Sequence, residues 1–494
     1  MSQQTMIINA LHPEEFRVAL VEGHTLESFF IETASRGKVV GNIYKGIITH
    51  VQPSLQAAFV NFGMEKNGFL PFPEIHPEYY QSEPTARARI QDVINNEQEV
   101  LVQVVKEEVG TKGALLTTYI SLAGRDVVLM PGQAQRGVSR KIEDEEQRER
   151  LKELARDLKV PDEFGVIIRT AAEERNKKEV AKDLNHLMKI WEEVKKRVQE
   201  AEAPAIIYKE QDLALRVIRD YFSPNVKTIL VDDKDVHRRV KEFLRIISPK
   251  QQGVVKFHKG EGPICSKFNL EDQIEQIYQR RVPLRSGGHL VIDPTEALVA
   301  IDVNSGRTSS DGALEETVFK VNMEAAAEIP RQLRLRDLGG LIVVDFIDMR
   351  DNRHAREVER RLKDEFKKDK AKITVGRISR FGLLELSRQH LGLNILRGSY
   401  RQCSTCHGSG LLRSVDATAL HYFRKIWLAL AQKKHATVKG VFAVDVANYL
   451  LNRKRNDIQR LEEHYQASIV IEGSPSVPPD EGVIESVLRE NGQG

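Results

Sequence analysis

The sequence predicts a multidomain protein built from mixed α/β domains, and three observations support this fold class. The chain has 494 residues, and single hydrophobic cores stop growing at about 250–300 residues. Short apolar runs separated by turn residues at 38–73, with a further run at Val100–Val105, are typical of a small β-barrel. From 290 to 375, apolar runs alternate with helical patterns, which is typical of an α/β domain.

The middle of the chain has its own pattern. Residues 141–200 are highly charged, and their apolar members recur at helical spacing: Leu184, Leu187, Met188, Trp191, Val194 and Val198. Gly165–Thr170 predicts a buried strand between two such helices, and 205–250 predicts alternating strands and helices.

In the α/β region, we expect strands at Leu290–Ile292, Ala297–Val303, Leu341–Asp345 and Ile373–Val375, with helices at 314–335 and 352–368. Residues 415–472 predict a small α/β unit. The segment from Ser474 is rich in Pro, Glu and Gly, so we expect it to be disordered.

The bulk composition excludes several classes of protein. Three cysteines in so long a chain argue against a disulfide framework. The N-terminus lacks the pattern of a secretory signal, and no apolar stretch is long enough to span a bilayer. We therefore expect a cytoplasmic protein. A net charge of +3 permits nucleic-acid binding without requiring it.

Two carboxylates stand at the ends of apolar strands. Asp302 and Asp345 occupy positions where open α/β sheets place their sites. Side chains alternate along a strand, so Asn304 shares a face with Asp302, and Asp348 points away from Asp345 if that strand continues. Magnesium favours oxygen ligands and is usually held by one or two carboxylates, and Asn304 could orient the first of them. The alternative is that both carboxylates are strand-end caps.

Three motifs decide between these alternatives by resemblance. Ala300–Ser305 (AIDVNS), Leu335–Met349 (LRDLGGLIVVDFIDM) and Ile378–Glu385 (ISRFGLLE) closely resemble the catalytic domain of the ribonuclease E/G family. The likeness runs from about residue 20 to about residue 415. It implies a DNase I-like domain at 281–400, in which Asp302 and Asp345 hold catalytic magnesium and Asn304 supports Asp302.

The resemblance also implies the remaining domains. They are an RNase H-like structural domain at 1–37 and 206–280, an S1-type OB-fold at 38–119, a 5′-monophosphate sensor region at 120–205, a zinc link at 401–412, a small C-terminal domain at 413–473 and a tail at 474–494.

Two phenylalanines of the S1-type barrel are expected to bind RNA. Phe59 and Phe69 would be exposed rings on which bases stack, and Lys112 would lie near the RNA backbone. The alternative makes both rings core residues, and Phe62 competes with Phe59 for the exposed position.

The family resemblance places the 5′-monophosphate sensor at Gly124, Val128, Arg169, Thr170 and Lys372. A guanidinium and a hydroxyl suit a phosphate end. The Lys372 position often holds an arginine in the family, and lysine keeps the charge but loses the bidentate geometry. For Arg169 alone, the alternative is a surface salt bridge.

Two groups of arginines could form a basic surface along the RNA path: Arg331, Arg334 and Arg336, and Arg377, Arg380 and Arg388. A solvated helix face explains the same pattern.

The segment Cys403-Ser404-Thr405-Cys406-His407 has three interpretations. It contains the haem c attachment pattern, but that chemistry needs export. It could be a redox dithiol, although those usually open a helix in a βαβ unit. It could also be half of a zinc site, because structural zinc takes four ligands. In the resembled family, two chains share one zinc through Cys403 and Cys406, which implies a homodimer or a higher assembly.

The sequence thus predicts an endoribonuclease that hydrolyses single-stranded RNA to 5′-phosphate and 3′-hydroxyl ends, stimulated by a 5′-monophosphate. Its expected substrates are ribosomal RNA precursors and messenger RNA. The chain lacks a long disordered scaffold, so we expect it to be ribonuclease G-like, with a compact ribonuclease E as the alternative. Rival hypotheses are a non-catalytic ribosome- or RNA-binding scaffold, and a metal-dependent phosphatase or DNA nuclease.

Overall fold

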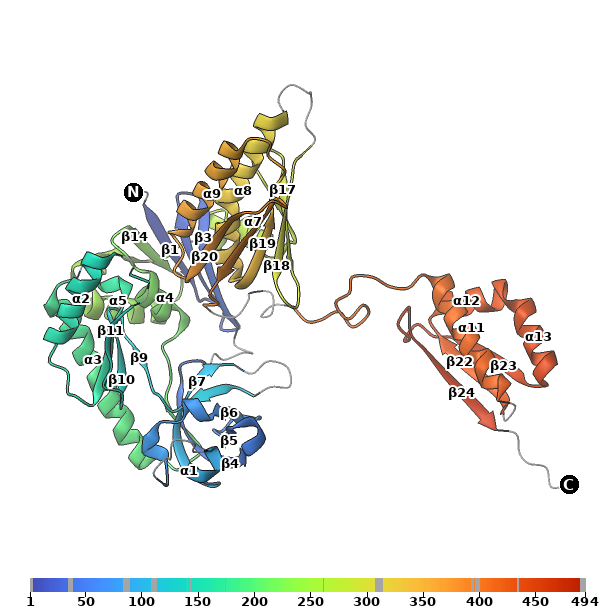
Figure 1. Ribbon diagram of the computed structural model, residues 1–494, viewed down its shortest axis with the longest axis horizontal. Coiled ribbons are helices and arrows are strands. Elements are labelled where there is room, and N and C mark those ends of the chain that lie inside the picture. The colour runs from blue at the N-terminus through green and yellow to red at the C-terminus, as the bar shows by residue number, and fades with distance from the viewer. Residues whose placement is uncertain are drawn as a thin grey trace. The chain divides into compact units, whose positions relative to one another are not determined.

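The computed structural model forms two compact units, residues 1–398 and 399–494 (Figure 1). It describes residues 3–33, 39–82, 89–107, 113–139, 141–142, 144–173, 175–260, 262–306, 314–391, 395, 400–432 and 435–488. No helix in this described part of the chain is both long and apolar enough to cross a bilayer.

The first sheet of unit 1 has the strand order β15-β14-β1-β2-β3. Its strands are β1 (Gln4–Asn9), β2 (Glu15–Glu22), β3 (Thr25–Thr33), β14 (Val226–Val231) and β15 (Val255–Phe257). Both faces are covered: Met6 and Ile8 pack with α4 (Leu213–Tyr221) and α5 (Lys234–Ile247), whereas Ile7 packs with α6 (Ile264–Lys267) and α7 (Glu271–Tyr278). A short 3-10 turn, η6 (Pro249–Val254), leads into β15.

The second sheet closes into a five-stranded barrel, because β4 pairs with both β5 and β7. Its strands are β4 (Ile43–Gln52), β5 (Ala57–Asn61), β6 (Gly68–Pro71), β8 (Leu115–Thr117) and β7 (Glu99–Lys106), and β13 (Ala205–Tyr208) adds to β4. Short turns follow the chain: η2 (Pro53–Leu55), η3 (Phe72–Glu74), η4 (Pro77–Tyr79) and α1 (Ile90–Val93). Gly68 allows close packing, since a Cβ there would lie 2.3 Å from Leu116 Cδ1.

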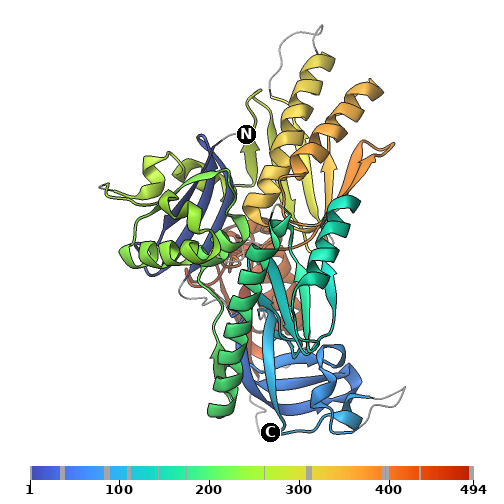
Figure 2. The ribbon, with the colours of Figure 1, turned by 90° about the vertical axis from the view of Figure 1, so that its left-hand side faces the viewer.

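A third, four-stranded sheet has the order β11-β12-β10-β9. Its strands are β9 (Leu122–Ala123), β10 (Val127–Pro131), β11 (Arg136–Val138) and β12 (Phe164–Ile168), and η5 (Thr170–Ala172) follows. Two charged helices pack on it through their apolar stripes, α2 (Glu145–Asp157) and α3 (Lys177–Glu200) (Figure 2). Asn176 caps α3 by accepting a hydrogen bond from the Glu179 N–H.

The fourth sheet carries the predicted carboxylates and has the order β16-β17-β18-β19-β21-β20. Its strands are β16 (Arg281–Pro283), β17 (His289–Pro294), β18 (Val299–Asn304), β19 (Gly340–Asp345), β20 (Ile373–Ile378) and β21 (Leu383–Arg388). The helices α8 (Leu314–Arg336) and α9 (Asn352–Phe366) lie side by side on one face (Figures 1 and 2). Their contact buries Ile301, Ile342 and Val344, so the intervening side chains project from the opposite face.

Unit 2 is a small α/β domain whose sheet has the order β23-β22-β24. Its elements are α11 (Val415–Ala431), β22 (His435–Phe442), α12 (Val444–Arg453), α13 (Arg455–Tyr465), β23 (Ser468–Gly473) and β24 (Gly482–Leu488). The expected disorder from Ser474 onward is wrong for β24, which pairs antiparallel with β22. The composition misled because Val483, Ile484 and Val487 supply a strand after a Pro-rich turn.

Candidate functional site

Asp302 and Asp345 face each other across two neighbouring strands. β18 and β19 are parallel, and their register pairs Asp302 directly with Asp345. Both side chains are exposed, while the alternate residues Ile301 and Val344 lie in the core beneath α8 and α9. Because neighbouring strands lie about 4.8 Å apart, the two carboxylates lie close together at the same end of the sheet and project from the same face.

Asn304 fixes the orientation of the first carboxylate. Its side-chain amide donates a 2.6 Å hydrogen bond to Asp302 Oδ2, as the alternation along the strand predicted. The pKa of Asp345 is raised by burial and by the negative charges of Asp302 and Asp348. Such mutual repulsion is what a bound cation relieves.

Asp348 lies closer to this pair than the sequence indicated. The expectation that it points away required the strand to continue, but β19 ends at Asp345. The charge of Asp348 raises the pKa of Asp345, which puts the two carboxylates within electrostatic range. Among the described residues, no group of three or more His, Cys, Asp or Glu side chains is arranged to hold a metal ion.

Sequence reasoning missed a buried residue that holds the loop after Asp345 in place. Asn322 of α8 is fully buried, and its amide clamps one residue of the loop after β19. Its Nδ2 donates to the Ile347 carbonyl at 2.8 Å, and its Oδ1 accepts from the Ile347 N–H at 3.2 Å. A sequence signal existed, because Asn322 falls on the same helical stripe as Val318 and Ala325, where an apolar residue is expected.

The two predicted aromatics of the barrel lie side by side on its surface. Phe59 of β5 pairs in register with Phe69 of β6, and their half-buried rings are 5.9 Å apart with 64° between the planes. Phe62 is 2% exposed and packs edge-on against Tyr44 in the barrel core, so it does not compete for the surface position. Lys112 lies outside the described residues.

Two of the predicted sensor residues, Arg169 and Gly124, are in direct contact, and two others lie on neighbouring elements. Arg169 donates to the Gly124 carbonyl at 2.5 Å and to Asp220 Oδ1 at 2.7 Å. Val128 lies on β10 beside the strand that ends before Arg169, and Thr170 begins η5. Asp220 was not foreseen, since it is 51 residues away in sequence.

A second carboxylate shapes the loop that carries Gly124. Asp183 of α3 accepts hydrogen bonds from the N–H groups of Asp126 at 2.8 Å and Val127 at 3.2 Å. It also fills the space beside Gly124, where a Cβ would lie 2.4 Å from Asp183 Oδ2. Any other side chain at this position would displace the Asp183 carboxylate from its hydrogen bonds to the loop, which is consistent with the glycine there.

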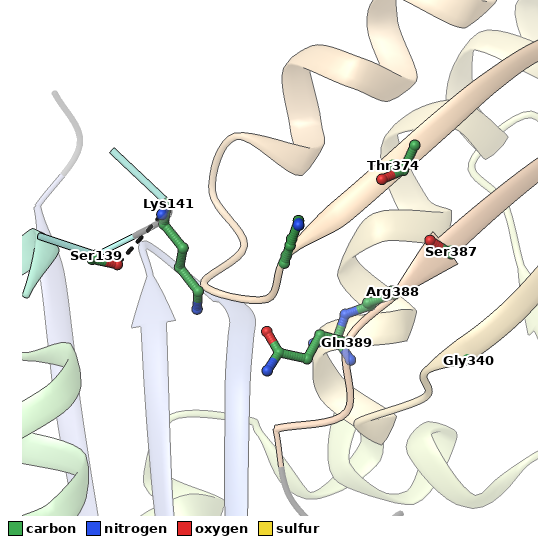
Figure 3. Close-up of a pocket in the computed structure, with 8 residues that line it drawn as sticks. Ser139, Lys141, Gly340, Thr374, Ser387, Arg388 and Gln389 are labelled. Carbon is green, nitrogen blue, oxygen red and sulfur yellow. Dashed lines mark hydrogen bonds between the residues drawn. The ribbon is translucent and has the colours of Figure 1, made fainter. Parts of the chain in front are cut away.

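The fifth sensor residue lines a neighbouring cavity. Lys372 borders a space of about 580 Å³ together with Ser139, Lys141, Gly340, Thr374, Ser387, Arg388 and Gln389. Lys141 and Arg388 approach this space from opposite sides (Figure 3). The pKa of Lys141 is lowered by burial and also by the charges of Arg169 and Arg388, so the cavity lies within electrostatic reach of the Arg169 cluster.

The two arginine groups were expected to form either a basic surface along the RNA path or a solvated helix face. Both expectations are wrong for the buried arginines. Arg336 and Arg388 are 2% and 3% exposed, and burial lowers the pKa of Arg336 to about 10. Arg334 pairs with Glu27, and Arg331 pairs with Glu328. Only Arg377 and Arg380 of the two groups are exposed. These arginines mostly tie elements together, and the pattern of charge along the chain could not reveal their distant partners.

The predicted zinc residues lie in a turn of unit 2. Cys403 is exposed, Cys406 is half-buried, and both are free thiols. Hydrogen bonds from the main chain at Cys406 and Thr405 lower the pKa of Cys403 to about 7, which favours the thiolate that metals bind. Burial raises the pKa of Cys265 in unit 1 to about 11, so this third cysteine has the opposite character.

Comparison with known proteins gives matches over most of the chain. A model of the ribonuclease E/G family matches residues 121–391, an S1 RNA-binding domain model matches 39–118, and a model of the thioredoxin-like domain of RNase E/G matches 402–487. The S1 match confirms that the chain contains an S1-type barrel.

Three curated relatives illustrate the similarity. The chain is 45% identical to ribonuclease E of Haemophilus influenzae, over 94% of this chain and 50% of the relative. It is 44% identical to ribonuclease E of Escherichia coli, over 92% and 43%. It is 38% identical to ribonuclease G of E. coli, over 84% and 86%. The chain thus spans about half the length of these two ribonuclease E relatives.

Proposed function

The chain belongs to the ribonuclease E/G family, and from that premise we propose that it is a magnesium-dependent endoribonuclease acting on single-stranded RNA. The observation that carries the proposal is the register of β18 and β19, which sets Asp302 opposite Asp345. Both carboxylates are exposed to a substrate, and the domain is attached to an S1 RNA-binding domain.

The donor set fits magnesium. Two carboxylates on one sheet edge match an ion that keeps several waters and takes one or two protein ligands. When bound, magnesium would neutralise charge on the scissile phosphate and make water a better nucleophile. Asn304 holds Asp302 by one oxygen, so the carboxylate is oriented before the substrate arrives.

The reaction is hydrolysis. A water oxygen bonds to phosphorus, the bond from phosphorus to the 3′-oxygen breaks, and the water proton passes to that oxygen. The products carry a 5′-phosphate and a 3′-hydroxyl. The domain at 281–400 would be DNase I-like, and the domain formed by 1–37 and 206–280 would be RNase H-like.

RNA would be held at two further places. Phe59 and Phe69 offer a pair of half-exposed rings for stacking. Lys112, which the structure does not describe, would bind the RNA backbone. Gly124, Val128, Arg169 and Thr170, with Lys372 nearby, would sense a 5′-monophosphate. Arg169 is already paired with Asp220, so a phosphate must compete for that guanidinium. This competition, together with lysine at 372, predicts modest stimulation by the 5′-monophosphate.

The C-x-x-C turn would form half of a zinc site shared with a second copy of the chain, giving a homodimer. The lowered pKa of Cys403 suits thiolate coordination. Cys403→Ser should abolish bound zinc and give monomers in analytical ultracentrifugation, whereas the neighbouring Ser404→Ala should change neither. Zinc-free dimers of Cys403→Ser would refute the link.

The physiological substrates would be ribosomal RNA precursors and messenger RNA. The identities of 45% and 44% to ribonuclease E exceed the 38% to ribonuclease G, so sequence similarity does not favour the ribonuclease G-like assignment.

One assay tests the activity. Full-length protein is incubated with a 5′-monophosphorylated single-stranded RNA, its 5′-hydroxyl twin and a single-stranded DNA of the same sequence, with magnesium or with EDTA. We expect RNA cleavage only with magnesium, faster on the monophosphorylated RNA, with 5′-phosphate and 3′-hydroxyl product ends. A 2′,3′-cyclic phosphate end or cleavage in EDTA would contradict the mechanism.

Asp302→Asn should abolish cleavage while RNA binding persists. Asp293→Asn, on the neighbouring strand and paired with Arg280, is the matched control and should remain active. Binding without cleavage by the wild-type protein would favour the scaffold hypothesis, and cutting of DNA in preference to RNA would favour the DNA nuclease.

A further inference from the structure

The β20–β21 hairpin ends in a well-defined turn beside the carboxylate pair. Ser379 N–H donates to the Leu383 carbonyl at 2.8 Å, and Gly382 N–H donates to the Ser379 carbonyl at 3.0 Å. The Phe381 N–H donates to Ser379 Oγ at 3.3 Å. Gly382 has a φ of +79°, a left-handed conformation that glycine adopts without strain. The turn therefore presents residues 380 and 381 in a fixed arrangement.

The position of this turn follows from the sheet register. Leu383, the first residue of β21, pairs with Asp345, the last residue of β19. The turn thus projects beyond the same end of the sheet as the two carboxylates. A Cβ on Gly382 would lie 3.2 Å from Asp348 Oδ1, so the turn touches the loop that follows Asp345. Phe381 is separated from the Asp345 pairing partner by a single residue.

Phe381 is 72% exposed, although the turn that carries it is fixed by hydrogen bonds. Phe346, which directly follows Asp345 at this end of the sheet, is 3% exposed and belongs to the core. Core packing therefore does not explain an aromatic ring at this position. The Arg380 guanidinium lies 4.8 Å from the centre of the Phe381 ring, in the range of a cation–π contact.

We propose that Phe381 stacks on the base of a nucleotide flanking the scissile phosphate, with Arg380 near the adjoining RNA backbone. The inference rests on the proposed function and deepens it, because it names what positions the RNA at the cut. A ring can stack on any base that is unpaired, but the bases of a duplex are already stacked and unavailable. The requirement for single-stranded RNA then arises at the cleavage edge itself, in addition to the S1 barrel.

The test uses the full chain and a single-stranded RNA with one cleavage site. Two variants are compared with the wild-type protein: Phe381→Ala removes the ring, and Phe381→Trp keeps an aromatic surface. Leu11→Ala is the matched control, because Leu11 is also exposed, at 59%, but lies between β1 and β2. All three changes are at the surface, so thermal melts should coincide with that of the wild-type protein.

We expect Phe381→Ala to lower kcat/KM about tenfold, which corresponds to about 1.4 kcal/mol and lies within the range for one stacked base. Phe381→Trp should recover the wild-type value, and Leu11→Ala should not differ from it. A series of RNAs, each with a single abasic residue at a different position around the cut, then locates the contact. At one flanking position, the abasic residue should slow the wild-type protein and leave Phe381→Ala unaffected.

A kcat/KM for Phe381→Ala within twofold of the wild-type value would overturn the inference, as would equal abasic effects in both proteins. A second readout does not depend on cleavage. In the Asp302→Asn background, 2-aminopurine at the same flanking position should be quenched on binding when Phe381 is present. Loss of this quenching with Phe381→Ala supports the inference even if no cleavage is found, whereas absent cleavage by the wild-type protein counts against the proposed function alone.

Discussion

The most demanding test of the sheet that carries the carboxylates is Arg388→Met. Arg388 is the last residue of β21, and it is buried. Its Nε donates to Asp369 Oδ2 at 2.8 Å, and its Nη1 donates to the Leu338 carbonyl at 2.7 Å and to Asp337 Oδ1 at 3.1 Å. One guanidinium thus joins the loop after α8, the loop after α9 and the end of β21.

The size of the effect follows from the burial of the partner. The Asp369 side chain is 1% exposed, so removing the guanidinium leaves a buried carboxylate without its counter-charge. Breaking a buried pair in this way costs about 3–5 kcal/mol. Burial opposes the charge of Arg388, yet the Asp369 hydrogen bond and charge outweigh it and raise the pKa of Arg388. Methionine fills most of the space, so the loss should come from the charge and the hydrogen bonds.

Hydrogen exchange with mass spectrometry measures this change locally, which matters because a multidomain chain does not unfold in one step. Amides of β20 and β21 should open about 3–5 kcal/mol more easily in Arg388→Met. The double variant Arg388→Met/Asp369→Leu should recover most of that loss, since both buried charges are gone. A loss under about 1 kcal/mol in the single variant, or a double variant that is worse than either single one, would refute the reasoning.

Loss of these Arg388 contacts should also change the cavity that Lys372 lines. The N–H of Gln389, the next residue, donates to the Lys372 carbonyl at 2.9 Å. Arg388→Met should therefore reduce the ratio of cleavage rates for 5′-monophosphorylated and 5′-hydroxyl RNA. An unchanged ratio would show that the position of Lys372 does not depend on the Arg388 contacts.

Three further predictions concern single residues. Magnesium at a hundred times its Kd should stabilise the wild-type protein by about 2.7 kcal/mol in a thermal shift assay, and Asp302→Asn should show no shift; an equal shift in both would place the ion elsewhere. Asn322→Leu should lower kcat with little change in KM for RNA, because it frees the loop after Asp345 while the RNA contacts remain; a change confined to KM would contradict this positioning role. Burial and the charge of Asp183 raise the pKa of Asp126 to about 6. Between about pH 4 and pH 6, the folded protein therefore binds more protons than the unfolded chain, and it loses stability as the pH rises through this range. Asp126→Asn should therefore stabilise the protein above pH 6, by up to about 3 kcal/mol in urea unfolding followed by hydrogen exchange, and not below pH 4; equal effects at both pH values would show that the charge is not responsible.

Local patterns in the sequence predicted much of the fold because strand alternation and helical spacing act over a few residues. They placed Asp302, Asn304 and Asp345 at strand ends, and β18 and β19 are strands at those positions. The same alternation, applied to β5, would have settled the choice between Phe59 and Phe62. Ala58 and Val60 are buried in the barrel, and the next residue in that phase is Phe62.

Contacts between distant residues could not be predicted in this way. Arg334 pairs with Glu27, 307 residues away, and Arg388 pairs with Asp369 and Asp337 in two separate loops. In the sequence, these arginines are indistinguishable from the exposed Arg377 and Arg380. The fate of each charge depends on which carboxylate the tertiary structure brings to it, and a single sequence carries no signal for that pairing.

The carboxylate site depends on one such long-range feature, the register of β18 against β19. Each aspartate alone is explained equally well as a strand-end cap. A slip of one residue would set Asp302 beside Val344 or Phe346, whose side chains belong to the core. The buried residues Ile301, Val303, Ile342 and Val344 prevent this slip, because it would move one set of them into solvent. The apolar packing under α8 and α9 therefore also fixes the distance between the two carboxylates, so a core substitution that permits slippage should abolish metal binding without touching either aspartate.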